Sequence, residues 1–322
     1  MLLYVHFSGD DDKMGRRKRM HRRRNKRKKL IIIFLCAVLC IMAVGYSAFS
    51  TNINITTKGN IKDKSRTIQS WSRTSNEDFH TDFYKENIVS VTFLDNAIVP
   101  SNAIEKWDVS ETKDQRVIAY VTESVTETGK YDLYIGAKNG VIANRDSSYL
   151  FKGFKGLKSI TFNDNLDTSQ TTNMIYMFAY CTNIIDLDLK SFNTNNVYEM
   201  GGMFEGCHNL KELDVSSFNT SKVKTMWYMF AECHELAEIN LSNFNTSNLI
   251  SMSAMFQGCH KIKELNLCSF NTTKVENYPE IFSYTTSLEQ VYVGNNWTLE
   301  NTSENKMFIS SNISSVITGK CG

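Results

Sequence analysis

A short repeated unit dominates the second half of the chain. Six phenylalanines recur at one constant interval, and a cysteine follows each of the first four at a fixed offset. A constant period of this kind is typical of proteins whose units bury their apolar faces only against neighbouring units. The phenylalanines are Phe178, Phe204, Phe230, Phe256, Phe282 and Phe308, and the cysteines are Cys181, Cys207, Cys233 and Cys259.

The composition of one unit predicts its elements. Leu213 and Val215 alternate with charged residues, which is the period of a strand with one buried face. Residues 219–221 supply capping side chains, and the apolar residues of 223–233 then follow at helical spacing. We therefore expect an α/β repeat solenoid with one short strand and one short helix per coil over residues 157–308, closed by a C-terminal cap over 309–322.

Two units carry a resemblance to a known family. Residues 210–233 (LKELDVSSFNTSKVKTMWYMFAEC) and 236–259 resemble the 26-residue repeat of the BspA-like leucine-rich-repeat surface proteins of bacteria. Residues 107–110 and 131–151 are similar to the domain that precedes those repeats, and we place a β-rich cap region over 85–156. The resemblance implies a leucine-rich-repeat-like solenoid with a non-catalytic role in cell-surface adhesion, bound to a protein or glycan. The alternative is a secreted or envelope scaffold without a host ligand.

The amino-terminal residues differ sharply in charge from the rest. Residues 1–29 contain 12 Lys and Arg against 3 Asp, a net charge of +9, so the rest of this +2 chain carries −7. The following residues 30–49 have no charged side chain and, as a helix, would span about 30 Å, the thickness of a bilayer core. Basic residues beside a membrane span stay in the cytoplasm.

These features predict a single-pass protein of the cell membrane. Residues 1–29 would be a cytoplasmic tail, 30–49 a transmembrane helix or signal-anchor, 50–84 a polar stalk, and the repeats would be extracellular. Cleavage of residues 30–49 as a signal peptide would instead give a secreted protein, and the length of the run favours a retained anchor. The position of the basic run beside this segment explains it without a nucleic-acid partner.

The cysteine column raises the question of a metal site. Three of its members precede histidines, but metal-binding spacings such as Cys-x-x-Cys are absent. We expect the phenylalanines up to Phe282 and the four cysteines to form a structural core, with no metal and no cofactor. Cys268 and Cys321 lie outside the column and either pair or stay free. No catalytic motif is present, so we do not expect an enzyme.

The predicted strands present two polar columns away from the core. Because strands in a sheet lie about 4.8 Å apart, like charges in one column repel each other. This face is either a solvated charged surface or a binding strip for a basic or cation-bridged ligand. The first column is Asp186, Glu212, Glu238 and Glu264, and the second is Asp188, Asp214, Asn240 and Asn266.

Overall fold

The computed structural model describes residues 54–55, 61–62, 66–319 and 321. The chain divides into two compact units, Met1–Asp63 and Lys64–Gly322. In the first unit, β1 (Asn54–Ile55) pairs antiparallel with β2 (Ile61–Lys62). The second unit contains the repeats and the elements that precede them, so it carries every surface on which a site is proposed below.

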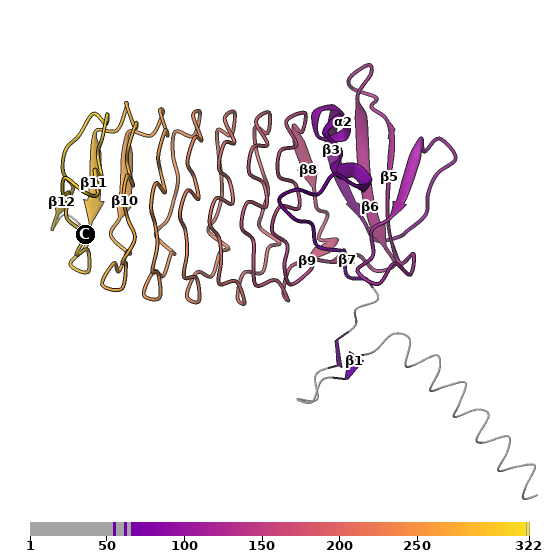
Figure 1. The fold of residues 1–322 in the computed structure, drawn as a ribbon, viewed down its shortest axis with the longest axis horizontal. Coiled ribbons are helices and arrows are strands. Elements are labelled where there is room, and N and C mark those ends of the chain that lie inside the picture. The colour runs from indigo at the N-terminus through magenta and orange to yellow at the C-terminus, as the bar shows by residue number, and fades with distance from the viewer. Residues whose placement is uncertain (1–53, 56–60, 63–65, 320, 322) are drawn as a thin grey trace, which may run out of the picture. The chain divides into compact units, whose positions relative to one another are not determined.

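A mixed sheet of five strands precedes the repeats (Figure 1). β3 is parallel to β6 and β8, whereas β5 is antiparallel to β4 and β6. The alternating or fully apolar composition of these strands buries one or both of their faces. In spatial order the strands are β4 (Glu105–Asp108), β5 (Val117–Glu123), β6 (Tyr131–Ala137), β3 (Ile88–Leu94) and β8 (Ser159–Thr161).

Two short helical elements lie before this sheet in the chain, η1 (Asp78–His80) and α2 (Asp82–Asn87). Ile68, Trp71 and Phe79 are buried in the same core as the sheet. The predicted polar stalk over 50–84 is therefore wrong in its second part, because these scattered large side chains provide enough apolar surface to pack. The capping region begins near residue 67 rather than at residue 85.

The sheet continues directly into the repeats. β8 belongs to the first repeat unit and pairs with β3, so the open side of that unit is covered by the capping sheet. A second link joins β7 (Val141–Ile142) in parallel to β9 (Leu166–Asp167). Terminal repeats must shield their apolar faces from water, and these pairings provide that shield.

Residues 157–308, here called the repeat stack, form successive units that lie side by side (Figure 1). Phenylalanine rings form a continuous column through its core, with neighbouring ring centroids 5.2 to 5.9 Å apart and planes within 17° of parallel. Isolated parallel bridges join each unit to the next, as between Glu199 and Thr225. The column begins at Phe151 in the capping region and continues through the repeat stack with Phe178, Phe204, Phe230, Phe256, Phe282 and Phe308.

The predicted α/β solenoid with a helix in each coil is wrong. Among the described residues the single α-helix is α2, with six residues, and the molecule is mostly sheet and turn. The apolar residues at helical spacing occupy consecutive turns instead. Tyr228 and Glu232 have positive φ angles of 54° and 57°, which no α-helix accommodates.

Backbone hydrogen bonds explain this outcome. The N–H groups of Met226, Tyr228 and Phe230 donate to carbonyls of the next unit, at 2.9 to 3.0 Å, rather than to carbonyls four residues earlier. Met229 N–H donates to Met226 C=O and closes a turn within the unit. Turns of this kind repeat every three or four residues, so they bury the same positions as a helix would.

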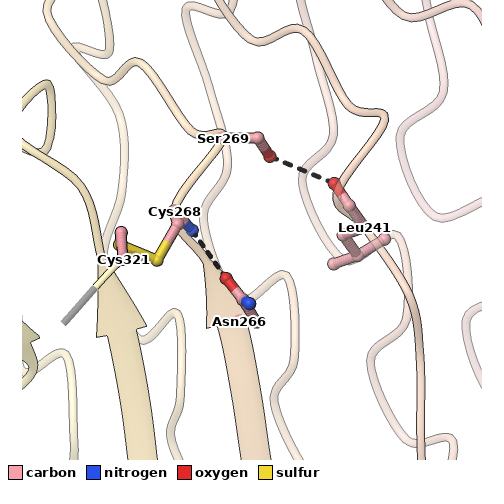
Figure 2. Close-up of a disulfide and its surroundings, with 5 residues drawn as sticks. All are labelled: Leu241, Asn266, Cys268, Ser269 and Cys321. Atoms are coloured by element: carbon pink, nitrogen blue, oxygen red, sulfur yellow. Dashed lines mark hydrogen bonds between the residues drawn. A yellow bond between two sulfur atoms is a disulfide. The ribbon is translucent and has the colours of Figure 1, made fainter.

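Regular strands are also fewer than the repeat predicts. Within the described part of the stack beyond β9, strands form only at the far end, where β10 (Glu264–Leu267) and β11 (Gln290–Val293) pair in parallel. β12 (Ile317–Thr318) extends this sheet. A disulfide between Cys268 and Cys321 ties the final residues to the stack (Figure 2). It resolves the two alternatives for these cysteines in favour of pairing.

The predicted membrane anchor receives no support. Within the part of the chain that the structure describes, no helix has both the length and the apolar character needed to cross a bilayer. The predicted transmembrane helix at 30–49 and the basic tail at 1–29 lie outside the described residues. The predictions of a single-pass topology, of the membrane as a partner and of a cell-membrane localisation are therefore withdrawn.

Candidate functional site

Four carboxylates form an exposed column along the repeat stack, one in each of four successive units. The neighbouring Leu187, Leu213 and Leu265 are buried, which leaves the residue before each of them pointing to solvent. The backbone N–H of Lys211 donates to the carbonyl of Ile185, which brings the neighbouring Glu212 and Asp186 side by side, and β10 and β11 keep the same register where Glu264 pairs with Gln290. The column, here called the acidic column, consists of Asp186, Glu212, Glu238 and Glu264.

Within the described residues, no Lys, Arg or His side chain forms an ion pair with the acidic column. Lys263, which directly precedes Glu264, instead has its Nζ 4.0 Å from the carboxylate of Glu289. Among the residues that the structure describes, the four negative charges therefore face solvent without a cationic partner. Their mutual repulsion is a cost that a cationic ligand would relieve.

The second predicted polar column, which begins at Asp188, stabilises turns of the backbone. In each unit the side-chain oxygen at this position accepts a hydrogen bond from the backbone N–H two residues later, at 3.0 to 3.1 Å. Hydrogen bonds from Ser216 lower the pKa of Asp214, because they stabilise its ionised form. This is the geometry of an Asx turn. The residues are Asp188, Asp214, Asn240 and Asn266.

The cysteine column lies entirely inside the stack. All four thiols are free and fully buried, and each Sγ donates a hydrogen bond to a phenylalanine carbonyl of the preceding unit, at 3.1 to 3.2 Å. Burial raises the pKa of Cys233 well above its usual value, because the thiolate cannot be solvated there. In the described part of the chain, no cluster of three or more His, Cys, Asp or Glu side chains is arranged to hold a metal ion.

The histidines that follow these cysteines stack on one another at the surface. His208 and His234 have ring centroids 4.4 Å apart, and His234 and His260 are 4.8 Å apart. Burial and the neighbouring His234 lower the pKa of His208, since two imidazolium rings in contact would repel each other. His234 also contacts the carboxylate of Glu232 at 2.8 Å.

Sequence reasoning missed a row of aromatic rings on another side of the stack. Trp227 covers Gly201, where a Cβ atom would lie 2.3 Å from the indole, and Tyr176 covers Gly202 in the same way. Tyr176 and Trp227 meet edge to face, with centroids 5.2 Å apart. A recognisable signal existed, because Tyr176, Gly202 and Tyr228 occupy the same repeat position in three successive units.

Next to the capping sheet, three tyrosine rings of this row lie around the side chain of Lys152. The Lys152 ammonium lies 4.3 Å from the ring centroid of Tyr176 and 5.4 Å from that of Tyr180. The Tyr180 hydroxyl donates to Glu205, whose other carboxylate oxygen has no hydrogen-bond partner within the described residues. Burial raises the pKa of Glu205 and lowers that of Lys152, so both groups are incompletely solvated.

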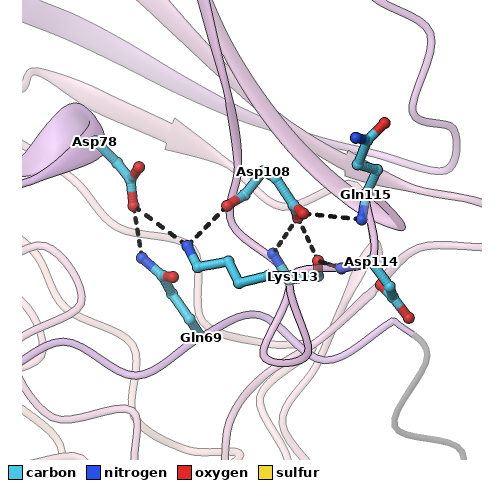
Figure 3. A network of polar contacts seen from close by, with 7 residues as sticks. Gln69, Asp78, Asp108, Lys113, Asp114 and Gln115 are labelled. Atoms are coloured by element: carbon cyan, nitrogen blue, oxygen red, sulfur yellow. Dashed lines mark hydrogen bonds and ion pairs between the residues drawn. The ribbon is translucent and has the colours of Figure 1, made fainter.

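A polar network in the capping region is structural (Figure 3). Asp108 accepts hydrogen bonds from the backbone N–H groups of Ser110 and Gln115, at 3.0 and 2.9 Å. Lys113 donates to the backbone carbonyl of Asp108 at 2.9 Å and lies 3.9 Å from Asp78. These contacts fix the loop between β4 and β5 against η1, and they satisfy the groups involved, so we assign no ligand to them.

Comparison with models of known protein families gives a match. A family model described as "Mycoplasma protein of unknown function, DUF285" matches residues 145–239 and 211–318. Neither the curated proteins nor the solved structures contain a match to the chain. The resemblance to the BspA-like family stays a prediction, because this match does not bear on it.

Proposed function

We propose a function for this chain on the premise that it belongs to the DUF285 family, whose model spans more than half of it and whose description assigns no activity. The protein is a non-catalytic recognition protein, and its repeat stack binds a basic segment of another protein. The observation that carries this proposal is the acidic column, four exposed carboxylates in register with no cationic partner among the described residues.

The charge arrangement selects an extended cationic ligand. Two unit charges about 4.8 Å apart in water repel by about 0.9 kcal/mol before salt screening, and the column contains three such neighbouring pairs. A Lys- or Arg-rich segment lying along the column replaces this repulsion with attraction. Long flexible side chains allow it to follow the spacing without a fixed backbone register. Binding through exposed charges of this kind weakens steeply as salt rises.

The test measures binding of a fluorescently labelled octalysine peptide to the full-length protein by fluorescence anisotropy, at 50 and 300 mM salt. We expect the Glu212→Gln/Glu238→Gln variant to bind at least tenfold more weakly than the original protein at low salt. The loss follows from removing the two central charges, each worth about 1 kcal/mol to a bound cation. The basic residues 16–29 are present in both proteins, so they do not affect the comparison.

A matched control keeps the net charge change equal. Glu235→Gln/Glu276→Gln removes two carboxylates of the same stack that lie outside the acidic column. This variant should bind within about twofold of the original protein. If both double variants lose the same affinity, the peptide responds only to overall charge, and the proposed site is wrong. If the original protein does not bind the peptide at low salt, the proposed function is wrong as well.

A further inference from the structure

A pocket of about 220 Å³ lies in the capping region, against residues just before the first repeat unit. One wall comes from residues 72–85, which include η1 and the first turns of α2, and the other comes from residues 149–155. Its volume is below the range of about 300 to 1,000 Å³ that drug-sized ligands occupy. The pocket therefore suits a small ion or a single group of a larger molecule.

Four cations line this pocket against one carboxylate. Arg73, Lys85, Lys152 and Lys155 supply the positive charge, and Asp82 supplies the negative charge. None of the four cations forms an ion pair with a carboxylate of the described residues. Burial lowers the pKa of Lys152, and the nearby Arg73 lowers it further. Four cations against one carboxylate leave this concave site with a net positive charge, which attracts an anion.

The pocket also contains a buried histidine with an unused nitrogen. His80 is 2% exposed, and its Nε2 has no hydrogen-bond partner among the described residues. Its ring stacks on Trp71, with ring centroids 4.6 Å apart and planes nearly parallel. Burial and the adjacent Lys85 keep the ring neutral, with a pKa of about 3. In the neutral tautomer that carries its proton on Nδ1, the unpartnered Nε2 is a hydrogen-bond acceptor.

We propose that this pocket binds a protonated phosphoryl group, either inorganic phosphate or a phosphate monoester. The lysines and the arginine neutralise its oxygen atoms, and its remaining P–O–H group donates a hydrogen bond to Nε2 of His80. Inorganic phosphate retains a proton at neutral pH, and a phosphate monoester retains one only as its monoanion, which is partly populated at pH 6.5 because the second pKa is about 6. Sulfate has no proton to donate. The pocket therefore discriminates between two anions of similar size and shape. This site is independent of the acidic column and of the function proposed above.

Isothermal titration calorimetry of the full-length protein at pH 6.5 and constant ionic strength tests the proposal. The titrants are inorganic phosphate, glycerol 3-phosphate and sulfate, and the buffer contains no other oxyanion of this type. We expect phosphate to bind at least tenfold more tightly than sulfate. Comparable binding of glycerol 3-phosphate would identify an esterified group as the ligand, and preference for inorganic phosphate would identify the free ion.

Variants separate the pocket from the basic residues elsewhere in the chain. Arg73→Gln/Lys155→Gln alters two exposed pocket residues and should weaken phosphate binding at least tenfold, whereas Lys138→Gln/Lys261→Gln removes two exposed cations elsewhere and should have no effect. His80→Phe should abolish the preference for phosphate over sulfate, and circular dichroism shows whether it is folded. Equal binding of sulfate and phosphate by the original protein, equal losses in both double variants, or no binding would each overturn the proposal.

Discussion

Lowering the pH from 7.5 to 5.0 should cost the folded protein about 2 kcal/mol through His80 alone, because its folded and unfolded pKa values differ. The pKa is about 3 in the folded state, chiefly because burial excludes water and secondarily because Lys85 is near. In the unfolded chain the pKa is about 6.5. As the pH falls below 6.5, His80 takes up a proton in the unfolded chain but stays neutral in the folded protein. The free energy of unfolding therefore falls until the pH reaches the folded pKa near 3.

The magnitude follows from this difference. Each pH unit between the two pKa values costs at most about 1.4 kcal/mol, and the interval from pH 6.5 to 5.0 gives about 2 kcal/mol. The assay is urea unfolding at pH 7.5 and 5.0 in phosphate-free buffer, followed by tryptophan fluorescence. Trp71 stacks on His80 and reports directly on this part of the core.

His80→Phe isolates the contribution. A phenyl ring can occupy the same aromatic cluster with Trp71, Phe79 and Phe154, but it binds no proton. The variant should lose about 2 kcal/mol less than the original protein on acidification, since the proton uptake of the unfolded chain at this position is gone. Phe154→Leu loosens the same cluster without removing a titratable group, so it should lower stability similarly at both pH values. A His80→Phe variant that keeps the full acid sensitivity would refute the reasoning.

Three further outcomes follow from the repeat stack and its end. Phe230→Ala should lower the free energy of unfolding by about 3 to 5 kcal/mol, and Phe308→Ala by less, because Phe308 is 7% exposed and lies at the end of the ring column. Iodoacetamide should leave Cys233 unmodified in the folded protein and label it after unfolding, as peptide mass spectrometry would show. Cys321→Ser should lower stability by up to about 4 kcal/mol, from the 53-residue separation of the disulfide, and hydrogen exchange should locate the loss around β12.

The repeat period could predict which side chains are buried but not the backbone that carries them. Met226, Met229, Phe230 and Cys233 are fully buried, as any conformation with a period of three to four residues would require. An α-helix and a series of turns both meet that requirement. The deciding hydrogen bonds run to carbonyls of the next repeat unit, as from Tyr228 N–H to Ser253 C=O. A local pattern contains no information about such partners.

The polar columns show a similar limit. Alternation in the strand segments was enough to place Glu212 and Asp214 on the solvent side. It did not distinguish a free carboxylate from one that accepts a backbone hydrogen bond, because that difference depends on whether the chain turns two residues later. Asp214 precedes such a turn and Glu212 does not. The available clue was the residue type, since all four members of the second column are Asp or Asn, whose side chains hydrogen-bond their own backbone two residues on.

The basic segment proposed for the acidic column and the phosphoryl group proposed for the pocket need different kinds of site, and only the first kind arises from a regular repeat. A regular repeat places the same group at the same position in every unit, so the acidic column suits a ligand that is itself repetitive, such as a run of lysines. A single small ion needs unlike groups to converge at one point. In this chain they converge where the period breaks, because His80 and Arg73 come from the capping region and Lys152 and Lys155 come from residues just before the first unit. A search for functional side chains that recur at the repeat interval therefore finds extended surfaces and misses compact pockets. The junction between a repeat array and its cap is where a pocket for a discrete ligand should be sought.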